Sequence, residues 1–104
     1  FCYFEDNIDA CVKAFESNLH VNDIINVGND HETSILELAK IIISATNSSS
    51  RIVHLPPLKE GDMTKRQPDT TNVRRLLNRE FTPLAVGIEK TIHSAVFKKL
   101  NGIA

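Results

Sequence analysis

"INVGNDHETSILELAKII", residues 25–42, is the stretch that decides how this chain folds. Ser34 stands three residues before Glu37, which is the spacing of a capping box at a helix N-terminus. A helix is therefore predicted over residues 34–46. Its isoleucines and leucines occupy more than one face, so we expect this helix to be buried on more than one side.

The sequence before this helix predicts one helix and one strand. "DIINVG", residues 23–28, is a short apolar run that stops at a glycine, as a buried strand would. Further upstream, apolar side chains recur every three or four residues, which predicts an amphipathic helix over about 6–17. Its apolar face comprises Ile8, Cys11, Val12, Phe15 and Leu19.

The residues that follow the central helix are predicted to end it and to form a second strand. "NSSS", residues 47–50, ends the helix, and "RIVHL", residues 51–55, predicts a second strand. Pro56 and Pro57 end that strand and open a polar loop that runs to residue 68.

Two further helices are predicted beyond this loop. The first runs to about Leu77, with Asp69, Thr70 or Thr71 as its cap. The second begins at Pro83, a residue suited to a helix N-terminus. Its buried stripe is predicted to comprise Ile88, Ile92, Ala95 and Val96. The whole chain is thus expected to be a helix-rich α+β arrangement with two short strands.

Composition indicates a small soluble domain. The 104 residues are 41% hydrophobic and 24% charged, and no apolar run approaches the ~20 residues that span a bilayer. The two cysteines form no Cys-x-x-Cys pair, so a disulfide framework is not expected. A cytoplasmic setting is expected instead. Because the chain starts on "FCYFED" without a methionine, we expect it to be a piece of a longer protein.

Charge is distributed unevenly along the chain. Residues 1–58 carry a formal charge of −5 and residues 59–104 carry +4. Such a split is typical either of ordinary solvated faces, the reading we favour, or of a surface for an anionic partner. The basic residues lack interleaved aromatics, so a nucleic-acid groove is not expected. The four histidines show no metal-ligand spacing, and "DHE" at 30–32 is interpreted as a polar loop.

Three stretches, taken in order, resemble the C-terminal part of the NAD-dependent epimerase/dehydratase family, the extended short-chain dehydrogenases of nucleotide sugars. "FCYFEDNIDA" is similar to the family's Phe-x-Tyr-Val-x-Asp segment, and "INVGNDHETSILELAKII" to its Asn-x-Gly-Asn segment and following helix. "DMTKRQPDTTNVRRLL" resembles its Asp-Pro-x-x-Arg-x-Pro-Asp turn, most closely that of the UDP-glucuronate decarboxylase branch. Met63 replaces a proline of that turn and Phe4 a valine of the first segment.

The resemblance implies a substrate site on this chain. Arg66 occupies the position whose arginine reaches the diphosphate of the nucleotide sugar, where a guanidinium forks two donors onto phosphate oxygens. Phe1 corresponds to an aromatic that lies along the nucleotide, and Tyr3 would share its face in an extended strand. The alternatives are an exposed arginine on a turn and two aromatic core residues. Asp69 is expected to cap a helix, and Gly28 to serve backbone conformation.

The resemblance also implies a fold and partners that lie beyond this chain. The parent fold would be α/β, with an NAD-binding Rossmann domain upstream, and residues 1–104 would be its small substrate-binding part. No glycine-rich turn exists here, and the family's Tyr-x-x-x-Lys dyad is absent, because Asn7 stands four residues after Tyr3. We therefore expect no NAD binding or catalysis from this chain alone.

The expected partners are a UDP-sugar in the complete protein and a second copy in a homodimer, without nucleic acid or membrane. The alternatives are the dTDP-glucose 4,6-dehydratase branch, the UDP-glucose 4-epimerase branch, and a stand-alone binding module without enzymatic activity.

Overall fold

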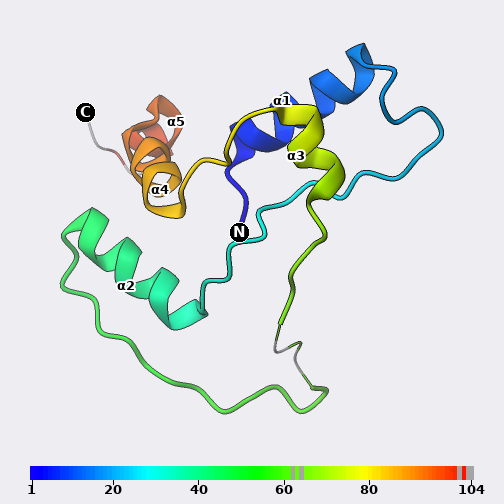
Figure 1. Cartoon of the computed structure of the whole chain (residues 1–104). Helices are drawn as coiled ribbons and strands as arrows, with labels where there is room; N and C mark the ends of the chain where they lie inside the picture. The colour runs from blue at the N-terminus through cyan, green and yellow to red at the C-terminus, as the bar shows by residue number, and fades with distance from the viewer. Residues whose placement is uncertain (62, 64, 101, 103–104) are drawn as a thin grey trace.

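Five helices make up the regular structure of the computed structural model (Figure 1). The structure describes residues 1–61, 63, 65–100 and 102, without the side chains of residues 95–97. The helices are α1 (Phe4–Glu16), α2 (Ile35–Thr46), α3 (Thr71–Leu77), α4 (Leu84–His93) and α5 (Ala95–Leu100). No helix in this described part is long and apolar enough to cross a bilayer.

A small hydrophobic core lies where α1 packs against α3. Ala10 of α1 and Val73 and Leu77 of α3 are almost completely buried, and Phe81 of the following loop joins them. The helix at 6–17 and the short helix ending at Leu77 are thus confirmed in place. The buried face of α1 is that of Asp6 and Ala10, however, and the predicted apolar face is exposed at Ile8, Val12 and Phe15.

The start of α2 is the capping box that the sequence predicts. The Glu37 amide donates to the Ser34 hydroxyl at 3.1 Å, and the Ser34 amide donates to a Glu37 carboxylate oxygen at 2.8 Å. The helix ends at Asn47, which has a left-handed φ of 50° and whose backbone amide donates hydrogen bonds to the carbonyls of Ile43 and Ser44. This cap explains why "NSSS" stops the helix.

The prediction that α2 is buried on more than one side is wrong. None of its residues is buried, and Ile35 is 72% exposed. The physical reason is that α4 is the helix that α2 packs against in the described structure, so its remaining apolar surface faces outward (Figure 1).

The two predicted strands are also corrected. Residues 23–28 are extended, and Ile25 and Val27 are half-buried against the core, whereas Ile24 is exposed. Residues 51–55 are extended and exposed. Within the described residues neither segment belongs to a β-ladder, because no neighbouring strand is there to supply its hydrogen bonds. The described fold is all-α rather than α+β.

The C-terminal helix begins after Pro83 as predicted but is divided. α4 stops at His93, Ser94 adopts an extended ψ of 146°, and α5 follows. Ile88 and Ile92 are half-buried as part of the predicted stripe, whereas the side chains of Ala95 and Val96 lie outside the described residues.

The chain is more open than a self-sufficient domain of its length. Its radius of gyration is 16.8 Å, against about 13 Å for a compact 104-residue domain. Its accessible surface is 8523 Å², against roughly 5,800 Å² for a folded monomer of 11.6 kDa. Much of the difference is apolar: along α1, the side chains of Phe4, Ile8, Val12 and Phe15 are exposed on one face.

A buried carboxylate joins α1 to the loop before α4. Asp6 is 1% exposed; it accepts hydrogen bonds from Arg79 at 2.8 Å and from the Thr82 amide and hydroxyl at 2.8 and 3.0 Å. Burial raises the pKa of Asp6, but these donors outweigh burial and the net pKa is lowered. Arg79 also donates to Asp9 at 2.9 Å, which completes the link.

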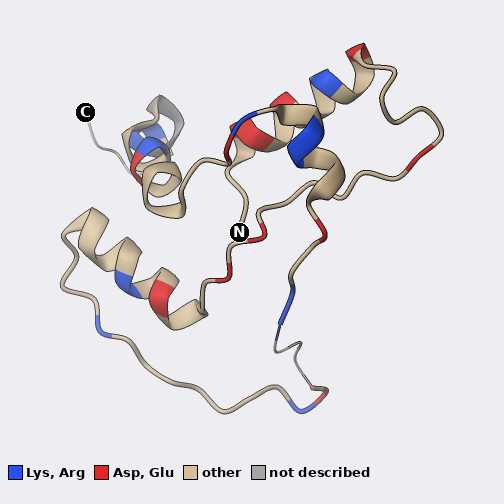
Figure 2. Cartoon of the chain, in the orientation of Figure 1, with Lys and Arg blue, Asp and Glu red and all other residues tan. Residues whose placement is uncertain are grey.

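Ion pairing inside the chain explains the uneven charge distribution. The cations of four pairs, Arg74, Arg79, Lys65 and Lys90, belong to residues 59–104, and their carboxylate partners Asp30, Asp6, Glu32 and Glu5 belong to residues 1–58. Figure 2 shows acidic positions on the loop before α2 and basic positions on the loop before α3. The split therefore serves contacts between the two halves, in addition to solvation.

Candidate functional site

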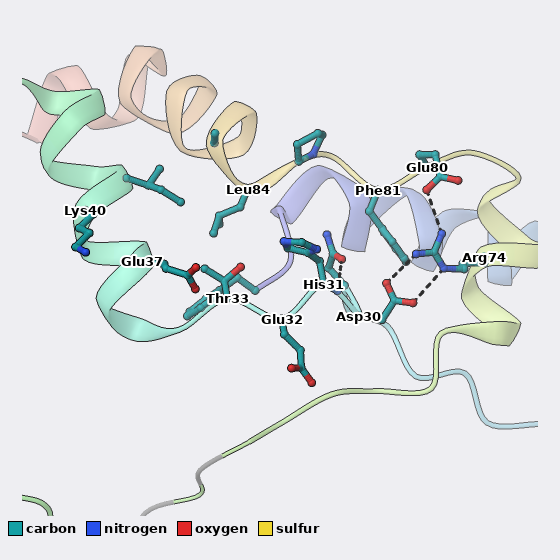
Figure 3. A pocket seen from close by; sticks show the side chains of 15 residues that line it. Asp30, His31, Glu32, Thr33, Glu37, Lys40, Arg74, Glu80, Phe81 and Leu84 are labelled. Atoms are coloured by element: carbon teal, nitrogen blue, oxygen red, sulfur yellow. Dashed lines mark hydrogen bonds and ion pairs between the residues drawn. The ribbon is translucent and has the colours of Figure 1, made fainter.

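Two open clefts flank the loop that leads into α2. One has a volume of about 800 Å³ and lies between this loop, α2 and the start of α4 (Figure 3). The other, of about 760 Å³, lies between the same loop and the loop before α3. Phe1 and His31 line both, so the clefts adjoin.

The charged side chains at one end of the first cleft form ion pairs with one another. Arg74 donates to Asp30 at 2.7 Å and to Glu80 at 3.1 Å, and its guanidinium lies 5.0 Å from the ring centre of Phe81. Hydrogen bonds from Arg74 and Thr70 lower the pKa of Asp30 to about 2. Figure 3 shows this arrangement at the end opposite Lys40 of α2.

The second cleft holds a cation without a carboxylate partner. Lys65 pairs with Glu32 at 2.5 Å. Arg66, the next residue, is exposed and makes no hydrogen bond or ion pair with the residues that the structure describes. Phe1, 52% exposed, and Met63 add apolar surface to the same cleft. The cleft therefore offers an unpaired guanidinium beside an aromatic ring.

Two loops distant in sequence hold this arrangement together. The ring of Pro68 lies 3.1 Å from where a side chain on Gly28 would begin, so any larger residue at position 28 would require Pro68 to shift by a few tenths of an ångström. The Gln67 amide donates to the Asp30 carbonyl at 3.0 Å, and Lys65 pairs with Glu32. Contacts thus join 28 to 68, 30 to 67 and 32 to 65, which is an antiparallel alignment of the two loops.

The structure places the predicted site residues in two groups. Phe1 and Arg66 line the same cleft. Tyr3 does not line it; its ring packs on Gly87 of α4, with Lys90 5.3 Å from the ring centre. Gly28 has an ordinary φ, so its role is close packing rather than the unusual backbone conformation that we expected.

Asp69 acts at the start of α3, where a cap was expected. Its carboxylate accepts from the hydroxyl of Thr71 at 2.7 Å and from its amide at 2.9 Å. These two hydrogen bonds lower the pKa of Asp69. Thr70 is the formal N-cap but makes no side-chain cap, since its hydroxyl donates to Asp30 at 2.7 Å instead.

Sequence reasoning missed Asp30. "DHE" was interpreted as a polar loop, yet Asp30 connects three partners, Arg74, Thr70 and Gln67. The charge asymmetry was the available signal, because an acidic loop and a basic loop of matching length suggest mutual pairing. Across the described residues, no group of three or more histidine, cysteine or carboxylate side chains is arranged to hold a metal ion.

Comparison with known proteins gives partial matches to decarboxylases of UDP-linked uronic acids. UDP-glucuronic acid decarboxylase 1 of Danio rerio is 37% identical over 93 residues, which cover 88% of this chain and 22% of the relative. UDP-N-acetyl-alpha-D-glucosaminuronate decarboxylase of Bacillus cytotoxicus is 35% identical over 81 residues, 73% of this chain and 25% of the relative. UDP-glucuronic acid decarboxylase 4 of Arabidopsis thaliana is 32% identical over 80 residues, 77% of this chain and 17% of the relative.

The chain spans a quarter or less of the length of these curated relatives. No family model and no solved structure matches it.

Proposed function

We propose that this chain is the nucleotide-sugar-binding part of an NAD-dependent enzyme of the epimerase/dehydratase family, and that the enzyme decarboxylates a UDP-linked uronic acid. The similarity to curated decarboxylases over 73–88% of the chain supports the substrate class. The short coverage of those relatives, together with the open shape of the chain, supports a part of a larger protein.

The observation that carries the proposal is the guanidinium of Arg66, which has no partner among the residues that the structure describes. The cation beside it, Lys65, has a carboxylate partner, and so does Arg74 in the adjoining cleft. Arg66 is therefore the guanidinium in these clefts that remains available for a diphosphate. Phe1 lies in the same cleft and offers a face on which a nucleoside can rest.

The residues of this chain do not fit the NAD that such an enzyme uses. A dinucleotide pyrophosphate needs glycines that open the N-terminus of a helix. Gly28 is covered by Pro68, and Gly87 is covered by Tyr3 in the middle of α4. No NAD-dependent step is therefore assigned to this chain, and its part in the reaction is to bind the substrate and hold its orientation.

Titration calorimetry with UDP-glucuronate tests the proposal on the complete protein that contains this chain. Arg66→Gln removes the charge and keeps a shorter side chain with a polar end. We expect it to weaken binding about ten- to hundredfold, the range for a lost hydrogen bond to a charged group. Arg75→Gln is the matched control, because Arg75 is also exposed but lines neither cleft.

Unchanged affinity in Arg66→Gln, or an equal loss in both variants, would contradict the role of Arg66. Product analysis addresses the reaction itself. UDP-glucuronate and UDP-N-acetylglucosaminuronate are each supplied with NAD, and carbon dioxide and the UDP-pentose product are measured. Release from neither substrate would rule out the decarboxylase.

A further inference from the structure

Asp30 makes hydrogen bonds with three residues that are distant in the sequence. Its Oδ1 accepts from Arg74 Nη2 at 2.7 Å, its Oδ2 accepts from the Thr70 hydroxyl at 2.7 Å, and its carbonyl accepts from Gln67 at 3.0 Å. The Arg74 Nε also donates to the Thr70 hydroxyl at 3.1 Å. Asp30, Thr70 and Arg74 therefore form a closed triangle of hydrogen bonds.

Two of these partners follow Arg66 closely in the sequence. Gln67 follows it directly, and Thr70 is buried at the end of the same loop, just before α3. The antiparallel alignment of the loops, with contacts from 28 to 68 and from 32 to 65, places Arg66 opposite His31. Asp30 therefore holds the α3 end of the loop that contains Arg66. Its backbone carbonyl accepts from Gln67 and its carboxylate accepts from Thr70.

We propose that Asp30 is a positioning residue for the anion site: it fixes the loop 65–70 so that the Arg66 guanidinium faces the cleft that Phe1 lines. This inference rests on the proposed function, because it concerns the same diphosphate. Asp30 itself does not bind the ligand; a carboxylate there would repel an anion, and its charge is balanced by Arg74.

The physical reason for such a residue is that Arg66 makes no hydrogen bond or ion pair with the rest of the described chain. An exposed arginine samples many rotamers, and ordering it on binding costs side-chain entropy. A loop that is fixed beforehand confines the guanidinium and lowers that cost. The triangle supplies the rigidity, because Thr70 is buried and its hydroxyl makes hydrogen bonds with both Asp30 and Arg74.

The test uses the complete protein and UDP as the probe, with three variants. Asp30→Asn keeps the shape but replaces one acceptor oxygen by a donor. Thr70→Val keeps the shape of a buried residue and removes the hydroxyl of the triangle. Asp23→Asn is the control, because Asp23 is another loop aspartate whose carboxylate accepts a hydrogen bond, from the Ile24 amide, but it lines neither cleft. Each is combined with Arg66→Gln in a double-mutant cycle.

We expect Asp30→Asn to weaken UDP binding by at least about threefold and by no more than Arg66→Gln does, because it acts through Arg66. In the Arg66→Gln background it should have no further effect. Thr70→Val should weaken binding in the same way and by less, and Asp23→Asn should change nothing. An equal loss in both backgrounds would overturn the inference, since it would mean general damage to the fold.

A second readout needs no ligand. Amide relaxation measured by NMR should show that Gln67 and its neighbours become more mobile in Asp30→Asn and stay ordered in Asp23→Asn. If the loop loosens but Arg66→Gln leaves UDP affinity unchanged, the positioning of the loop stands and the proposed function fails. If the loop keeps its order in Asp30→Asn, the inference itself is overturned.

Discussion

The buried carboxylate of Asp6 gives the sharpest prediction about stability. We expect Asp6→Asn to lower the free energy of unfolding of the chain by about 3 kcal/mol. The wild-type carboxylate accepts three hydrogen bonds, from Arg79 and from the amide and hydroxyl of Thr82. Asparagine has one acceptor oxygen, so its NH₂ group must face one of these donors.

The magnitude follows from the burial of the two partners. A donor left without an acceptor in a buried position costs about 1–3 kcal/mol, and loss of the charged partner of Arg79 adds to it. Breaking a fully buried ion pair costs about 3–5 kcal/mol. The lower end applies here, because the Arg79 side chain is 39% exposed and keeps its contact with Asp9.

Asp9→Asn is the matched control. Asp9 lies on the same helix and accepts from the same Arg79 at 2.9 and 3.1 Å, but its side chain is 34% exposed. An exposed pair contributes less than about 1 kcal/mol, so this variant should change stability little. The assay is urea unfolding followed by far-ultraviolet circular dichroism, in which Asp6→Asn should lower the midpoint by roughly 1–2 M. Equal losses in the two variants would refute the reasoning, because burial would then not decide the cost.

Two further predictions concern acid and self-association. The pKa values of Asp6 and Asp30 are lowered by folding, that of Asp30 from 3.8 to about 2. Their contribution to stability is therefore complete above their unfolded pKa values and is lost as pH falls through the folded ones, so helical ellipticity should decrease between about pH 4 and pH 2. Retention of full ellipticity at about pH 2 would contradict this. Secondly, we expect the chain to associate at high micromolar concentration through the exposed apolar face of α1, and Phe15→Glu to weaken that association. Light scattering across a concentration series measures it, and a strictly monomeric wild-type mass would rule it out.

Local signals predicted the helices well, because their causes are local. The capping box at Ser34 and Glu37, the stop at Asn47 and the start after Pro83 each depend on residues within one turn. The strands failed for the opposite reason: a strand depends on a neighbour, and the short apolar run at 23–28 predicts an extended segment without showing what it pairs with. The burial of α2 failed similarly, because apolar composition does not reveal which surface covers a helix.

The site was predictable to the extent that a family motif carries it. Arg66 and Phe1 were selected from such motifs, and the structure brings them to one cleft, although their roles remain proposals. Asp30 and Asp6 were not selected, because their partners lie 37 or more positions away along the chain. The spacing of residues within a short stretch does not indicate contacts between residues so far apart in the sequence.

The order in which the helices pair has a consequence for how the chain reaches its native state. α1 packs with α3 and α2 packs with α4, so the two pairs interleave along the sequence (Figure 1). No two helices that are consecutive among the first four form a packed hairpin in the described structure. Their contacts are therefore non-local, and loop closure must precede packing, which slows folding relative to a bundle of sequential hairpins. During synthesis, α1 and α2 leave the ribosome before either of their partners exists. The surfaces with which they contact α3 and α4 stay open to other molecules until those helices follow.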